Sequence, residues 1–438
     1  MTTNNTLPHD VPELKEVLLG FLDSASSMCD MMNTTMAAVL NEIMSIQADE
    51  ACGAPSRSRD AGRVNQRNGY RERGLETTVG KLDLLVPKLR HGSFFPTDLL
   101  ERYSRTDRAL AAAVAEMYVT GTSTRKVEKV ARRFGVESLS KDQVSRLCAV
   151  IDGEVDAFLS RRWDGMAFPY LFLDATYVKC RVNGRVRGQA FITAIGVGGD
   201  GRKRFLGFAC ANAETHASWR GFLEDLADRG VEGVRLVTSD AHDGLVRAIA
   251  EVFPDASWQR CIVHVKRDVL RAVGDRDGQR RASAVMSAVF AEKDPVMVVA
   301  LYHRAIDELE AFCPRAARVL EEAEADALTY LSFPRAHRLK VRTNNVQERM
   351  NCELKRRVKV VQAFPSTDSA MRLLGGIIGE INTDWEASNR FVSEESLRPL
   401  VDGGRVEDRL GEYGPDEDAE QSARVIMRTA LDRLGKAA

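Results

Sequence analysis

Apolar and polar residues follow two different periods along the chain, and the changes between them divide it into regions. Over residues 11–48, apolar side chains recur every three or four positions, which predicts a helical region. Alternation with a period of two around Leu82 and Leu84 predicts a small hairpin whose turn lies near Gly80. Helical spacing returns over residues 107–158. The N-terminal part of the chain is therefore expected to be mainly helical, with one two-stranded element.

From Tyr170 onward the pattern changes to that of a sheet. Three short apolar runs with Gly-containing links, "LFLDATYVKC", "VRGQAFITAIGV" and "KRFLGFACAN", predict an antiparallel meander. Two further strands, "VRLVTSD" and "SWQRCIVH", are each followed by a helical stretch, which favours parallel pairing. The predicted fold class is therefore α/β with a mixed five-stranded sheet. This is the element order of the ribonuclease-H-like fold, and we expect a core of that kind.

The region after this core is helical in character. Residues 275–331 are rich in Ala, Glu and Arg, with apolar residues at helical spacing, and they predict an all-helical insertion. The stretch "RTNNVQERMNCELKRRVKVVQAFPS" then predicts a strongly polar helix that begins near Asn344 or Asn345.

A helix-turn-helix pattern lies within residues 107–158. A helix in "STRKVEKVARRFGV" ends at Gly135, and the next helix opens with Ser140 as N-cap and Gln143 three residues later, which is a capping box. The N-terminal residues of such a second helix face DNA bases. The residues suited to contact bases or phosphates there are Lys141, Gln143, Ser145 and Arg146. An ordinary three-helix packing unit with a solvated polar face explains the same pattern.

Composition and charge add information on environment and partners. The net charge is -1, but residues 335–359 contain nine Lys or Arg against two acids, while residues 401–420 contain eight acids against two Arg. A near-neutral total can therefore include a basic face. The eight cysteines are scattered without a C-x-x-C, as in a reduced intracellular protein. The chain has neither a signal-peptide pattern nor an apolar run long enough to span a membrane, so we expect a cytoplasmic protein.

Three carboxylates stand out from the predicted elements. Asp174 lies in the middle of the first strand, Asp240 closes the fourth, and Glu348 lies on the late polar helix. A buried, unpaired carboxylate is costly. For Asp174 alone, a salt bridge or a structural hydrogen bond is one explanation. If the three acids converge, they need a cation, and Mg²⁺ or Mn²⁺ in a two-metal site suits carboxylates and phosphodiester displacement.

Other residues near these acids are candidates for binding a metal or DNA phosphates. Cys261-x-x-His264 has half the spacing of a zinc site, but no second ligand pair is evident, so we expect no zinc there. His264, at the predicted end of the fifth strand, is suited to contact a phosphate or to support the acids. The basic cluster after Glu348 is suited to hold DNA phosphates and consists of Lys355, Arg356, Arg357 and Lys359.

Eight stretches, in order, resemble the Mutator-type transposases of bacterial insertion sequences. They are "RNGYRER", "VGKLDLLVPKLRHGSFFP", "VTGTSTRKVEKV", "SLSKDQVSRLCAVID", "LFLDATYVKCR", "VTSDAHDGL", "WQRCIVHVKRDV" and "RTNNVQERMNCELKRRVKVVQAFPS". The resemblance covers most of residues 66–390, whereas residues 1–65 and 391–438 match poorly. It implies a DDE catalytic triad on a ribonuclease-H-like core with a helical insertion before the Glu.

The resemblance also implies which residues act. The triad falls on Asp174, Asp240 and Glu348, and the family's basic residue seven positions after the Glu falls on Lys355. The family's C-x-x-H motif falls on the supporting residues Cys261 and His264.

The implied function is a DDE transposase. It would bind the terminal inverted repeats of its insertion sequence and catalyse metal-dependent strand cleavage and strand transfer. It would act on element and target DNA in a bacterial cell, associated with the nucleoid, as a homo-dimer or higher oligomer. A DNA-binding regulator without chemistry and a nuclease that only hydrolyses are the alternatives.

The expected organisation has seven segments. They are an N-terminal helical region and linker (1–65), a small β segment (66–104), a helix-turn-helix domain (105–162), the first part of the catalytic core (163–272), an all-helical insertion (273–340), the second part of the core with the Glu helix (341–392) and an acidic C-terminal tail (393–438).

Overall fold

The structure, a computed structural model, divides into two compact units. They comprise residues 1–153 and 154–438, and each is described by itself. The residues described are 28–55, 58, 61–77, 80–92, 94–96, 117, 126, 150–359, 361–403 and 406–435. The candidate helix-turn-helix residues Lys141, Gln143, Ser145 and Arg146 lie outside the described residues, so that motif stays a prediction.

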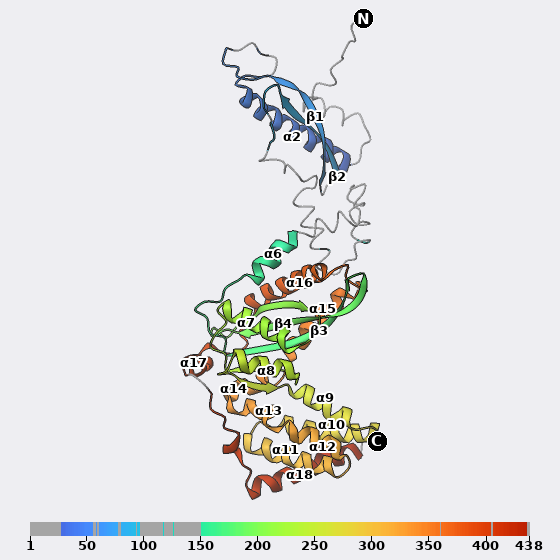
Figure 1. The fold of residues 1–438 in the computed structure, drawn as a ribbon, viewed down its shortest axis with the longest axis vertical. Coiled ribbons are helices and arrows are strands. Elements are labelled where there is room, and N and C mark those ends of the chain that lie inside the picture. Colours follow the sequence, from blue (N-terminus) through green and yellow to red (C-terminus); the bar gives the residue numbers. More distant parts are fainter. Residues whose placement is uncertain are drawn as a thin grey trace. The chain divides into compact units, whose positions relative to one another are not determined.

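In the first unit, one helix packs on a two-stranded hairpin (Figure 1). Helix α2 (Met28–Cys52) contributes Met44 to a core formed with apolar side chains of the second strand. The antiparallel strands are β1 (Arg67–Thr77) and β2 (Gly80–Leu89). The hairpin is present as predicted, and its ladder extends to Thr77 and Gly80. Gly80 therefore ends the ladder on β2, and the turn lies next to it, as predicted.

The second unit is built on the predicted mixed sheet of five strands. Its strands are β3 (Tyr170–Val182), β4 (Arg185–Val197), β5 (Lys203–Ala211), β6 (Leu236–Ser239) and β7 (Ser257–Arg260). The strand order is β5-β4-β3-β6-β7. The three long strands pair antiparallel, whereas β6 is parallel to β3 and β7 is parallel to β6. The α/β class and the mixed pairing are thus confirmed.

Alternation along β3 sends its side chains to two different helical layers. Leu171 and Leu173 join a buried core with helices α7 (His216–Asp228) and α8 (Asp243–Val252). Phe172, which lies between them, belongs to the opposite face, where its ring meets Phe391 edge to face. On that face lie helices α15 (Asn345–Val358) and α16 (Thr367–Ala387). Asp174 shares this second face, so the sheet itself aims its carboxylate toward α15.

A helical region separates β7 from α15, as expected for the insertion. Its elements are α9 (Ile262–Ala272), α10 (Arg276–Ala291), α11 (Pro295–Glu310), α12 (Pro314–Glu322), α13 (Glu324–Leu328), the 3-10 turn η1 (Thr329–Ser332) and α14 (Arg335–Val341). Local sequence explains the start of α11, because Asp294 accepts a hydrogen bond from the Met297 N–H and Pro295 takes the first helical position.

One boundary differs from expectation. Strand β7 ends at Arg260, and Cys261 is the N-cap of α9, so His264 lies in the first turn of a helix and not at the end of a strand. The reason is that β7 pairs only with the four residues of β6, and no ladder remains to extend it. In α8, His242 occupies the N-cap and Asp243 lies in the first turn.

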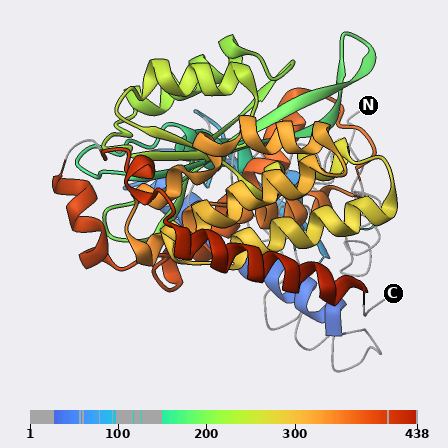
Figure 2. The ribbon, with the colours of Figure 1, turned by 90° about the horizontal axis from the view of Figure 1, so that it is seen from below.

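The C-terminal segment, described from its composition as an acidic tail, contains helices. They are α17 (Glu394–Asp402), the 3-10 turn η2 (Leu410–Tyr413) and α18 (Glu417–Gly435). At the other end of this unit, helix α6 (Val150–Leu159) precedes the sheet. Helix α18 packs along α10 and α11, as Figure 2 shows. None of the helices in the described part of the chain has the length and apolar character needed to cross a bilayer.

Candidate active site

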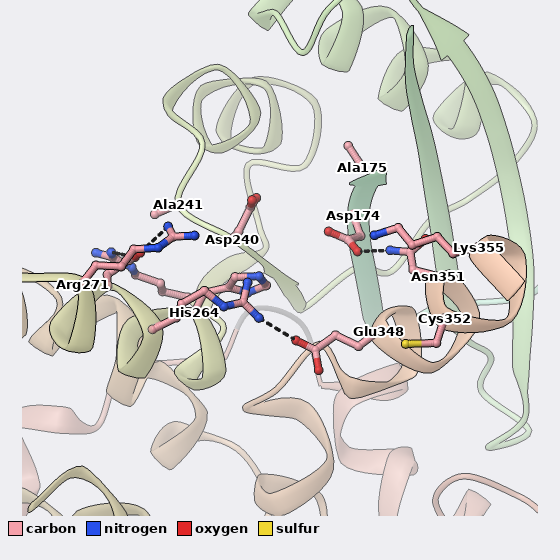
Figure 3. Close-up of a pocket in the computed structure, with 13 residues that line it drawn as sticks. Asp174, Ala175, Asp240, Ala241, His264, Arg271, Glu348, Asn351, Cys352 and Lys355 are labelled. Carbon is pink, nitrogen blue, oxygen red and sulfur yellow. Dashed lines mark hydrogen bonds and ion pairs between the residues drawn. The ribbon is translucent and has the colours of Figure 1, made fainter. Parts of the chain in front are cut away.

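Three acids from three separate elements line one cleft (Figure 3). Asp174 comes from β3, Asp240 follows β6 directly, and Glu348 lies in the first turn of α15. The parallel pairing of Phe172 with Thr238 explains why the two aspartates are neighbours, since each lies two residues further along its strand direction. The cleft has a volume of about 640 Å³ and is open to solvent. The structure therefore brings together the three carboxylates singled out from the sequence.

Buried amide side chains hold α15 against β3. The Asn344 side chain donates to the Leu173 carbonyl at 2.8 Å, and the Gln347 side chain donates to the Phe172 carbonyl at 2.7 Å. Gln347 also accepts a hydrogen bond from the Thr193 hydroxyl at 3.0 Å. These contacts use backbone carbonyls of the strand that carries Asp174. They fix the helix that carries Glu348 relative to that strand.

Asn351 extends this contact to the candidate catalytic group itself, because its side-chain N–H donates to Asp174 Oδ2. Asn344, Gln347 and Asn351 are spaced three and four residues apart, so they occupy one face of α15. The sequence interpretation did not assign them a role. Their helical spacing next to Glu348 was the signal that could have identified them.

The cleft concentrates negative charge around Asp174. Burial, and then the nearby Asp240, raise the pKa of the Asp174 carboxyl to about 7, with smaller contributions from Glu214 and Glu348. Glu214, which follows β5, is half-buried, and burial together with Asp240 raises the pKa of its carboxyl. The location of Glu214 depends on the turn after β5 and could not be inferred from spacing. Such a set of acids favours a bound cation.

The oxygen atoms present suit a divalent cation. Glu348 Oε1 is buried and accepts no hydrogen bond, and the nearest cation is the Arg267 guanidinium at 3.7 Å. Carboxylate oxygens are the ligands that Mg²⁺ prefers. Within the described ranges, no three His, Cys, Asp or Glu side chains form one ready-made metal cluster. The fit to a divalent cation therefore rests on the donor type and on the unsatisfied charge of these acids.

Basic side chains surround the acids, and most were not anticipated. Arg260 and Arg267 line the cleft from β7 and α9. Arg271 on α9 and Lys355 on α15 line it as well (Figure 3). Arg267 and Arg271 are one helical turn apart, and this spacing in "VKRDVLRAV" was the available signal. A cleft that combines carboxylates with such cations is suited to hold a phosphate group next to the acids.

The predicted basic cluster on α15 divides into residues with different surroundings. Arg356 and Arg357 both pair with Glu353 at 2.6 Å, and Arg357 also pairs with Glu380 on α16. The Arg357 side chain is 11% exposed, so this residue joins two helices. Lys355 lines the cleft, and Lys359 is exposed just after α15.

Cys261 and His264 have distinct environments. Cys261 is fully buried, and its Sγ accepts a hydrogen bond from the Asn344 N–H at 3.2 Å, which connects the starts of α9 and α15. His264 lines the cleft, and its Nδ1 is buried without a hydrogen-bond partner. Burial lowers the pKa of His264, so its imidazole is neutral near pH 7.

Comparison with known proteins agrees with a role in DNA rearrangement. The family model described as "Transposase, Mutator family" matches residues 13–388, and the chain belongs to this family of transposases. The chain is 38% identical over 373 residues to the transposase for insertion sequence element IS1081 of Mycobacterium tuberculosis, covering 85% of this chain and 90% of that protein. It is 35% identical over 363 residues to the transposase for insertion sequence element IS256 in transposon Tn4001 of Staphylococcus aureus, covering 82% of this chain and 92% of that protein. These matches confirm the family resemblance and support DNA transposition.

The raised pKa of Asp174 predicts a pH-dependent stability of the metal-free protein. Folding raises the pKa of the Asp174 carboxyl from 3.8 to about 7. The free-energy cost of ionising this carboxyl in the folded state therefore grows as the pH rises between those values, and it is fully present above about pH 7. Asp174→Asn should therefore raise the free energy of unfolding by up to about 4 kcal/mol at pH 8. The gain should shrink as the pH is lowered from 7 toward 5. Urea unfolding without divalent cations measures it, with Asp243→Asn as control, and a gain that is the same at every pH would contradict the assignment.

Proposed function

We propose that the protein is a DDE transposase with a ribonuclease-H-like core. It binds the terminal inverted repeats of its insertion sequence and catalyses DNA cleavage and strand transfer with Asp174, Asp240 and Glu348. The observation that carries this proposal is that these three acids, from β3, β6 and α15, line a single cleft. Family membership supports a reaction on DNA. A dimer or larger assembly on DNA is part of the proposal, since two element ends have to be held together.

The proposed chemistry consists of two in-line displacements at phosphorus. In the first, a water oxygen bonds to phosphorus and the bond to the 3′ oxygen breaks, which leaves a 3′-hydroxyl and a 5′-phosphate. In the second, that 3′-hydroxyl attacks a target phosphodiester, and the 3′ oxygen of the target strand leaves and takes up a proton. Mg²⁺ or Mn²⁺ held by the three acids would supply activation of the attacking oxygen and stabilisation of the leaving oxygen.

The chain's own residues prepare this reaction. Asn351 orients the Asp174 carboxylate through its hydrogen bond, while Gln347 keeps α15 on the sheet. Arg267 and Lys355 provide positive charge for phosphate oxygens next to the acids. The neutral His264 imidazole can donate a hydrogen bond from its ring N–H to a phosphate oxygen. Together these contacts position DNA so that both displacements can use one site.

A strand-transfer assay tests this proposal. The protein is given a duplex that carries an element end with a free 3′-hydroxyl, together with plasmid target DNA and Mg²⁺. Joined products are expected, with far fewer from a duplex of scrambled end sequence. Cleavage without joining would instead show a nuclease, and binding without either reaction would show a DNA-binding regulator.

A further inference from the structure

Strands β3 and β4 continue past the rest of the sheet as a two-stranded ribbon, which we define as residues 178–189 (Figure 1). Strand β4 pairs with β5 only as far as Ala190, and β3 pairs with β6 only over Tyr170–Phe172. Beyond those points the two strands pair mainly with each other. Asn183 and Gly184 both have positive φ, 50° and 76°, as a tight two-residue hairpin turn requires.

The ribbon is strongly basic. Its exposed cations are Lys179, Arg181, Arg185 and Arg187, and the ribbon contains no acid. In the described part of the chain, none of these four side chains has an ion pair, and all four are exposed to water. Charged side chains on an edge strand can also serve to prevent aggregation. Acidic side chains would serve that purpose as well, so it does not explain why the ribbon has cations alone. Four unpaired cations within twelve residues instead indicate a negatively charged partner.

Strand pairing distributes these cations over both faces of the ribbon. Arg185 lies opposite Val182 and Arg187 opposite Cys180, so both are on the face that contains Asp174. Lys179 and Arg181 alternate to the other face. A partner that contacts all four cations must therefore present negative charge on two sides. The major groove of duplex DNA is about 12 Å wide, admits a two-stranded ribbon and has phosphates along both walls.

The ribbon is also connected to the candidate active site. Its strand β3 contains Asp174, five residues before Lys179. Phe364, which follows α15, accepts a hydrogen bond from the Arg181 N–H at 2.9 Å and donates one to the Lys179 carbonyl at 2.7 Å. At about 3.4 Å per strand residue, Lys179 and Arg181 lie about 17–24 Å along the strand from Asp174, which is the length of about five to seven base pairs.

We propose that the ribbon enters the major groove of the DNA on which the protein acts and contacts phosphates on both walls, about five to seven base pairs from the reacting phosphate. This inference rests on the proposed function, because it takes DNA as the substrate. The contacts hold and align the duplex without reading its sequence, since phosphates carry no base information. Charge on both faces fits a hairpin that extends beyond the rest of the sheet, where, among the residues described, only the backbone of Phe364 pairs with the edge of β3.

Salt-dependent DNA binding tests the ribbon. The first double variant, Lys179→Gln with Arg181→Gln, removes the charge from one face of the ribbon. The second, Arg185→Gln with Arg187→Gln, removes it from the other face, and a quadruple variant combines both. Each double variant should reduce the slope of log affinity against log salt by about 2, since each lost phosphate contact contributes about 0.9. The quadruple variant should bind about 10–100-fold more weakly near 0.15 M salt, equally on element-end and scrambled duplexes. Arg424→Gln with Arg428→Gln, two exposed arginines on α18, is the matched control and should change neither quantity.

Two additional measurements separate charge from folding and from chemistry. A triple variant with Arg181→Lys, Arg185→Lys and Arg187→Lys keeps the positive charge and should keep the salt slope. All variants should melt at the same temperature as the unchanged protein. Binding is measured without divalent cations, so a failure of strand transfer in the unchanged protein would count against the proposed function and not against the ribbon. Salt slopes that match the α18 control, or a loss confined to element-end DNA, would overturn the ribbon proposal.

Discussion

Replacing any one of Asp174, Asp240 or Glu348 by alanine should reduce DNA cleavage and strand transfer by about 10³-fold or more. Each change removes a carboxylate from the cleft that the three acids line, and with it several kcal/mol of stabilisation of the transition-state charge. DNA binding should survive, because the change removes negative charge next to the phosphates. Cleavage and joining of a labelled element end, measured beside a binding titration, give both results.

Asp243→Ala is the matched control for this series. Asp243 is three residues after Asp240, but it lies in the first turn of α8 and does not line the cleft. It should keep normal activity. Near-normal strand transfer by any one of the three alanine variants would remove that residue from the proposed triad, whereas loss of binding together with activity would point to a structural role for it.

In the absence of divalent cations, the protein should bind DNA but neither cut nor join it. Mg²⁺ or Mn²⁺ should restore both reactions, since the carboxylates of the cleft suit these ions and their charge is otherwise unsatisfied. Ca²⁺ should support binding better than chemistry. Because binding of an ion to the folded state alone stabilises it, Mg²⁺ at about 100 times its dissociation constant should add about 2.7 kcal/mol to the unfolding free energy. That gain should be absent from Asp174→Ala.

Zinc chelation is the control for the second prediction. The Cys261 thiol is buried and accepts a hydrogen bond from the Asn344 N–H, so it has a structural contact without a metal. A chelator selective for zinc should therefore leave cleavage and joining intact when Mg²⁺ is present. Activity that disappears under this treatment and returns with zinc would assign a metal to Cys261 and His264. Activity that persists fully without any divalent cation would refute the metal-dependent mechanism itself.

The sheet and the meeting of Asp174 with Asp240 could be predicted because they depend on local patterns. Short apolar runs identified the strands, and the link lengths separated antiparallel from parallel pairing. Once β3 and β6 are neighbours, register alone brings the two aspartates to the same sheet edge. Glu348 was singled out from the sequence as a carboxylate on the late polar helix, and the family resemblance placed it in the triad, but its approach to the cleft depends on how α15 packs.

The parts that could not be predicted depend on contacts between distant segments. Arg357 belongs to a basic run, but only the structure shows that Glu380 on α16 pairs with its guanidinium. The spacing of Asn351 from Asn344 and Gln347 indicates a shared helix face, but that its side chain donates to Asp174 depends on how α15 packs on β3. His264 was placed at the end of the fifth predicted strand, whereas its backbone belongs to the first turn of α9.

The amide contacts of α15 have a consequence for the order in which the protein is made. Asn351 lies 177 residues after Asp174, with the helical insertion between them. At about 5–20 residues per second, a ribosome needs roughly 10–35 s to pass from one to the other. Once Asp240 has been added, the nascent chain holds both aspartates and the strands that carry them, but until the end of that interval it has neither Glu348 nor the amides that position its helix. Chains that are released or cut within the insertion therefore lack the third acid, and competence for reaction is acquired only near the end of synthesis.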